Sequence, residues 1–133
     1  MPTPNGFSGL HCRNWPCMIL LFVASGCGPK LPAATDAEKQ EARKALLTAL
    51  DAWQAGKTHE LKKQTPPITF TDDDVVQGHA LVSYDLDPAM EIKPQTDVRV
   101  NLIVRDRAGQ TQHRSATYQV TLTPTPSVLR NDP

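Results

Sequence analysis

Three consecutive aspartates, Asp72, Asp73 and Asp74, are the most concentrated set of chemically active side chains in this sequence. Hard cations such as Ca²⁺ take several oxygen ligands, which carboxylates in a loop supply. The run lacks the spaced acidic positions and the glycine of a calcium-binding loop. We therefore expect a solvated turn, marked as a loop by Gly78, in which aspartates cap a helix or end a strand. A calcium-responsive module is the competing hypothesis.

Histidine chemistry is the second possibility, because His59, His79 and His113 lie beyond the first 26 residues. A catalytic histidine needs a nucleophile or a carboxylate within hydrogen-bond reach. The sequence contains no serine–histidine–acid set, phosphate-binding glycine loop or metal motif with the residue spacing that such a site requires. His79, beside Gly78, is expected in a loop. The sequence thus predicts no catalytic, cofactor-binding or metal-binding residues and a protein that is not an enzyme.

The aromatic residues and the charge limit the classes of partner that we expect this chain to bind. Trp53, Phe70, Tyr84 and Tyr118 are the aromatic residues after position 26, too few to favour carbohydrate or base stacking. The two tyrosines are expected in the core with their hydroxyls at its edge, although they could also line a pocket. Lys and Arg number 14 and Asp and Glu also number 14, so no concentrated basic face for nucleic acid is expected.

The N-terminal segment is typical of a processed export signal. Arg13 precedes an apolar run over residues 18–24, which is far too short for a membrane-spanning helix, and small residues follow it. Ala24-Ser25-Gly26-Cys27 resembles the lipobox of bacterial lipoproteins. The resemblance implies cleavage before Cys27, diacylglycerol on its thiol and acylation of its amino group. A secretory signal with a chance cysteine is the alternative.

That resemblance also implies a cellular location and a domain organisation. Processing discards Cys12 and Cys17 and the lipid consumes Cys27, so no thiol remains for a disulfide, a nucleophile or zinc. We expect a signal peptide at 1–26, a lipidated tether at 27–34 and one domain at 35–133. The expected location is the bacterial cell envelope, facing the periplasm or the exterior. The membrane, through lipid on Cys27, and an envelope protein are the expected partners.

A helix over about residues 36–55 is strongly indicated. Thr35 and Glu38 have the spacing of a capping box, and Gly56 suits the end of the helix. A second, shorter helical possibility spans 57–64, with Thr58 as its cap and Leu61 as its apolar anchor. Apolar residues at helical spacing predict a buried stripe, with Trp53 as core: Ala42, Leu46, Ala49, Leu50 and Trp53.

Strand patterns follow the helices. A short β-like run at 68–70 precedes three stronger ones, at 80–86, 98–104 and 115–122. If the apolar faces of the last two coincide, Val98 lies opposite Tyr118 and the loop has three residues, 107–109. We expect residues 123–130 to add a short edge strand with a frayed polar end. The opposite face would be polar and would serve as a solvated face or a binding surface: Arg99, Asn101, Arg105, His113, Ser115 and Thr117.

These elements predict an α+β fold, with one N-terminal helix packed on a curved antiparallel sheet of three to five strands. The order of elements resembles the cystatin-like and nuclear-transport-factor-like superfold, a resemblance that implies a fold and not a function. The expected function is a membrane-anchored, non-enzymatic interaction domain. The alternative is a small-ligand-binding domain or weak enzyme that uses a pocket between helix and sheet.

Overall fold

The computed structural model describes residues 32–132. The predicted signal segment 1–26, Cys27 and most of the tether lie outside the described residues. In chain order the elements are α1 (Asp36–Gln54), η1 (Thr58–Lys63), β1 (Thr69–Thr71), α2 (Asp73–Val76), β2 (Ala80–Asp85), β3 (Asp97–Arg105), β4 (Thr111–Thr121) and β5 (Ser127–Arg130).

Helix α1 begins and ends where its sequence signals lie. The Thr35 side chain accepts a hydrogen bond from the Glu38 amide at 3.2 Å, and the Glu38 carboxylate accepts one from the Thr35 amide at 2.7 Å. This reciprocal pairing satisfies two of the amides that a helix start leaves free. After Ala55 the backbone leaves the helix at Gly56, whose φ of 71° is easy only for glycine. The predicted apolar stripe is buried: Ala42, Leu46, Ala49, Leu50 and Trp53.

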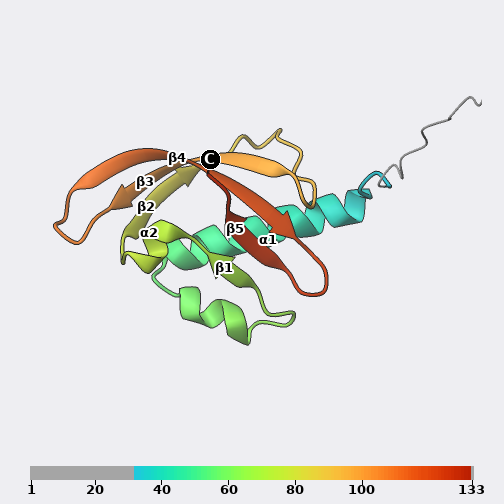
Figure 1. The fold of residues 1–133 in the computed structure, drawn as a ribbon, viewed down its shortest axis with the longest axis horizontal. Helices are drawn as coiled ribbons and strands as arrows, with labels where there is room; N and C mark the ends of the chain where they lie inside the picture. The colour runs from blue at the N-terminus through green and yellow to red at the C-terminus, as the bar shows by residue number, and fades with distance from the viewer. Residues whose placement is uncertain (1–31, 133) are drawn as a thin grey trace, which may run out of the picture. The chain divides into compact units, whose positions relative to one another are not determined.

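The five strands form one curved sheet in the order β1-β5-β4-β3-β2, with α1 lying against one of its faces (Figure 1). The predicted α+β arrangement is confirmed. One pairing departs from the antiparallel expectation, because β1 runs parallel to β5. The chain leaves β1 at one edge of the sheet, passes through α2 and enters β2 at the other edge. The sheet is therefore mixed at its β1 edge and antiparallel elsewhere.

The register of β3 and β4 is the predicted one. Val98 lies opposite Tyr118, and Asp106 and Gln110 close the hairpin through a 2.9 Å backbone hydrogen bond. The three-residue loop 107–109 is thus confirmed, with Gly109 at a φ of 84°. Side chains alternate across a strand, so this register sends one set of residues into the core and the other to the outer face, which we define as the face turned away from α1.

Three finer predictions are wrong. Lys57, not Thr58, precedes the first turn of η1, a 3₁₀ helix without a side-chain cap, although Leu61 is buried as expected. Strand β5 is not an edge strand, because β1 adds to its far side. The polar end after β5 is not frayed, since the Thr117 amide donates to the Asp132 carboxylate at 2.6 Å. Thr117 also accepts a backbone bond from Asn131 at 2.8 Å.

Candidate functional site

The triple aspartate does not form the solvated loop that the sequence predicted. Asp72 is the N-cap of the one-turn helix α2, where its carboxylate accepts hydrogen bonds from the amides of Asp74, at 2.7 Å, and Val75, at 3.3 Å. The predicted capping role is therefore confirmed. Asp72 and Asp74 are, however, only 1% and 0% exposed, and Asp73 alone faces solvent. Within a regular helix, residues two apart point to different sides. Asp72, however, is the N-cap and has an extended backbone, so its side chain turns inward beside that of Asp74.

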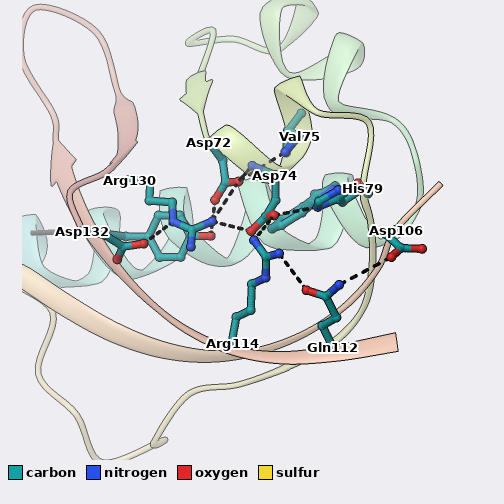
Figure 2. Close-up of polar contacts among 11 residues, drawn as sticks. Asp72, Asp74, Val75, His79, Asp106, Gln112, Arg114, Arg130 and Asp132 are labelled. Carbon is teal, nitrogen blue, oxygen red and sulfur yellow. Dashed lines mark hydrogen bonds and ion pairs between the residues drawn. The ribbon is translucent and has the colours of Figure 1, made fainter. Parts of the chain in front are cut away.

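Asp74 is the centre of the site. One of its oxygens lies 2.5 Å from an Arg114 nitrogen and 2.7 Å from Nδ1 of His79, and the other lies 2.5 Å from Arg130 (Figure 2). Burial by itself would raise the pKa of this carboxyl. Hydrogen bonds from Arg130 and His79, together with the charge of Arg114, outweigh burial and hold the pKa below its usual range. Asp74 is therefore ionised and shared among three cationic or polar partners.

Asp72 is held by a second set of contacts. The hydroxyl of Tyr118, which is fully buried, donates to its free oxygen at 2.6 Å, and Arg130 lies 3.4 Å from the other. Burial, then the charge of Asp72 and this hydrogen bond, raise the pKa of Tyr118 far above that of a free tyrosine. The Tyr118 hydroxyl thus remains a proton donor. Its predicted position at the edge of the core is wrong, because a buried carboxylate supplies the partner that solvent was expected to supply.

Tyr84 behaves differently. Its side chain is half-buried and its hydroxyl donates to Asp51 of α1 at 2.7 Å. Burial, and then this hydrogen bond, raise the pKa of Tyr84 to about 12. The two tyrosines therefore tie the sheet to different acidic groups, and only Tyr118 belongs to the site.

We call the set Asp72, Asp74, His79, Arg114, Tyr118 and Arg130 the aspartate–arginine network. It continues outward at both ends, where Arg114 donates to the Gln112 side chain at 2.8 Å and Arg130 contacts Asp132 (Figure 2). Arg130 is 12% exposed and Arg114 33%, so the network opens toward solvent at Arg114. Within residues 32–132, every buried side-chain nitrogen and oxygen has a hydrogen-bond partner.

The sequence contained part of the signal for this network. Ala116, Tyr118 and Val120 are the inward positions of β4, and the same alternation continued toward the hairpin places Arg114 and Gln112 inward. Two polar residues on an apolar face need buried partners. The identity of those partners, Asp72 and Asp74, comes from contacts 40 to 58 positions apart in sequence and could not be inferred from spacing.

The predicted histidines separate. His79 is a loop residue between α2 and β2, as expected, but its ring is only 14% exposed and paired with Asp74. His113 lies on the outer face, opposite Ile103 of β3. His59 is exposed on η1, with Glu60 4.0 Å away. No two of these histidines therefore converge on one site.

The same acidic and histidine side chains are the candidates for holding a metal ion. In the described part of the chain, no group of three or more His, Cys, Asp or Glu side chains is arranged to hold a metal ion. The oxygens of Asp72 and Asp74 point at guanidinium groups, a hydroxyl and backbone amides, which occupy the positions that cation coordination would need. Asp73 faces away from both.

No protein-family model, curated protein or solved structure matches this chain. Its function is therefore inferred from geometry. Of the helices formed by residues 32–132, none has the length and apolar character needed to cross a membrane.

Proposed function

We propose that this chain is a lipoprotein of the bacterial cell envelope, anchored through lipid on Cys27, whose domain binds another envelope component and catalyses no reaction. The lipobox resemblance of Ala24-Ser25-Gly26-Cys27 supports the anchor. The aspartate–arginine network supports a domain that catalyses no reaction, because its candidate catalytic groups are fully engaged with one another.

The pair of His79 and Asp74 is the arrangement closest to a catalytic one, since a carboxylate that orients a histidine can prepare it as a general base. In this domain the same carboxylate also binds Arg114 and Arg130 at 2.5 Å each. A carboxylate neutralised by two guanidinium groups stabilises an imidazolium far less than a free one does. The network is therefore suited to holding α2, β4 and β5 together, and this observation carries the non-enzymatic assignment.

The anchor is tested by Cys27→Ser in the full chain. Membrane fractionation should move the variant from the membrane pellet to the soluble fraction, because the two or three acyl chains that hold it are lost. Cys12→Ser is the matched control, since this cysteine lies in the segment that processing removes, and it should stay with membranes. A Cys27→Ser chain that still fractionates with membranes would contradict the lipoprotein assignment.

The interaction is tested by chemical crosslinking in intact cells that express the full chain. A defined envelope component should be recovered with the wild-type protein, and recovery should fall when the protein is displaced from the membrane by Cys27→Ser. Recovery of the protein alone, with no partner above the background of an unrelated lipoprotein, would contradict an interaction domain.

A second function, binding of a small ligand, is favoured by one hollow of about 290 Å³ that lies beside α1, at the segment before β1 and the loop between β4 and β5. Ala45 and Ile68 form part of its wall, and Pro66, Pro124 and Pro126 border it. Pockets of this size can hold a small ligand. An apolar fluorescent probe should lose affinity when Ala45→Leu fills the hollow, whereas Ala37→Leu, on an exposed turn of α1, should leave it unchanged. No probe binding to the wild type would eliminate this alternative.

A further inference from the structure

A group of lysines around η1 makes no ion pair within the described part of the chain. Lys39 and Lys93 contact carboxylates of neighbouring residues. The remaining lysines of residues 32–132 are exposed and have no carboxylate within 4.0 Å: Lys44, Lys57, Lys62 and Lys63. Lys44 joins the other three in space, because it borders the same hollow as Gln64, which follows η1. We call these four residues the lysine surface.

The fold holds η1 in a fixed position. Leu61 is only 1% exposed, and its carbonyl accepts a hydrogen bond from the Ile68 amide at 3.0 Å, which joins η1 to the segment before β1. In a 3₁₀ helix, residues three apart lie on the same side. Thr58 and Leu61 therefore form the inward side of η1, and Lys62 and Lys63 lie on its outward sides.

Charge is distributed unevenly over the domain. Residues 52–71 contain three lysines and a single acid, Glu60, whereas the rest of residues 32–132 contains nine Lys and Arg and 13 Asp and Glu. The charges of Arg114 and Arg130 are neutralised by the carboxylate of Asp74. The lysine surface is thus a positive region on a domain that is otherwise acidic. Such a distribution attracts one side of the domain to an anionic surface and repels the others.

The anchor proposed at Cys27 brings an anionic surface within reach. Nine peptide units connect Cys27 to Asp36, where α1 begins, and an extended chain of this length spans about 30 Å. Lys44 lies eight residues further along α1, about 12 Å from the start of the helix at about 1.5 Å per residue. The connecting segment is therefore long enough for the lysine surface to contact the headgroups of the membrane that holds the lipid.

We propose that the lysine surface docks on anionic phospholipid headgroups of the membrane to which Cys27 is anchored. Lysine ammonium groups donate to phosphate oxygens, and each lysine at an anionic membrane favours the docked domain by about fivefold. In Figure 1, η1 (green, below α1) lies on the side of the domain opposite β3 and β4, so the docked domain turns this strand pair away from the membrane. This inference rests on the proposed lipid anchor and adds an orientation of the domain to it.

The test uses the full lipidated chain, reconstituted in vesicles of phosphatidylglycerol, which is anionic, or of phosphatidylcholine, which has no net charge. A fluorescent label is attached through His59→Cys on η1 or, as the matched control, through His113→Cys on the outer face, since both histidines are exposed. Quenching by acrylamide, a neutral solute, reports the exposure of the label to water. The label at position 59 should be shielded on phosphatidylglycerol only, and the label at position 113 on neither.

The role of charge is tested in the protein labelled at position 59. Lys62→Gln/Lys63→Gln should shift the equilibrium toward the undocked domain by roughly 25-fold, because two contacts with phosphate are lost. Arg99→Gln/Arg105→Gln removes the same charge from exposed positions of β3 and should leave the shielding unchanged. Salt at about 1 M, where the Debye length is about 3 Å, should also expose the label. Circular dichroism establishes that all variants are folded.

The outcomes separate this inference from the proposed anchor. Shielding that requires both phosphatidylglycerol and the two lysines supports docking. Equal exposure of the two labels, or equal shielding on phosphatidylcholine, overturns docking while the anchor stands. A label at position 59 that stays exposed on vesicles, together with crosslinking from that position to a protein in intact cells, also overturns it and assigns the lysines to an acidic protein. A chain that does not incorporate into vesicles overturns both.

Discussion

His113 and Arg114 are neighbours on β4, yet their side chains lie on opposite faces of the sheet. Arg114 points to the inner face, where it meets Asp74 at 2.5 Å, and His113 points to the outer face and pairs with no other side chain of the described residues. The two faces use similar residue types: carboxylates, amides, basic groups and hydroxyls. On the inner face burial forces each polar group to find a partner, because an unpaired buried charge is very costly. On the outer face the same kinds of group are exposed, so they need no partner within the domain.

The comparison shows that the face of the sheet on which a polar side chain lies, and not its chemical type, decides whether it has a partner inside the domain. A cluster of aspartates, arginines and a histidine attracts attention as a potential active site. Its contacts describe a structural joint between α2, β4 and β5. On the outer face, the side chains of Asn101, His113 and Ser115 make no hydrogen bond with another described residue. Variants that disrupt one face at a time should separate these roles.

The largest effect is expected from Asp74→Asn. The variant leaves Arg114 and Arg130 facing a neutral amide inside the domain, so we expect the free energy of unfolding to fall by about 3–5 kcal/mol, measured by urea denaturation. Asp73→Asn, the exposed neighbour in the same helix turn, is the control and should change little. Equal effects of the two substitutions would mean that the inner network does not stabilise the fold.

Tyr118→Phe should have the next largest effect. The substitution keeps the ring in the core and removes only the hydroxyl that donates to Asp72 at 2.6 Å. A buried carboxylate that loses a donor costs about 1–3 kcal/mol. Tyr84→Phe removes a hydroxyl from a half-buried site beside Asp51, where water can replace it, and should cost less. Urea denaturation of both variants gives the comparison, and the reverse order would contradict the burial argument.

The sequence predicted the outline of the fold because its signals were local or periodic. Thr35 with Glu38 located the start of α1, and the alternation of Val98, Val100, Ala116 and Tyr118 determined the hairpin register. The parallel β1–β5 pairing was missed, because nothing in a three-residue strand specifies a partner 58 positions away. Pairing between distant strands depends on the closed tertiary structure and not on local propensity.

The polar residues likewise fall into a group whose placement the sequence predicted and a group whose placement it did not. The outer polar face was predicted from alternation alone, since period-two patterning assigns each strand residue to a face. The burial of Asp72 and Asp74 was not predicted, because three adjacent aspartates outside a tertiary context favour solvent. Only the arrival of Arg130, from β5, and Arg114, from β4, makes their burial tolerable.

A third prediction concerns acid. The pKa of Asp74 is lowered in the folded protein, so as pH falls the unfolded chain takes up its proton first. The ion pairs of Asp74 therefore contribute fully above the unfolded pKa of about 3.9, and the contribution is lost as pH falls through the lower folded value. Stability should fall by up to about 1.4 kcal/mol per pH unit for this one proton. Urea midpoints measured below pH 5 should fall more steeply for the wild type than for Asp74→Asn, and parallel curves would contradict the shifted pKa.

The smallest effect on stability should come from the outer face. His113→Ala removes an exposed side chain that makes no hydrogen bond within the described residues, so the free energy of unfolding should change by less than about 0.5 kcal/mol. Arg114→Ala, one position further along the strand, should cost clearly more, because Asp74 loses one of its guanidinium partners. Urea denaturation of the two variants tests the division between faces at a single peptide unit. A large loss in His113→Ala would show that the outer residues also hold the sheet together and would contradict this division.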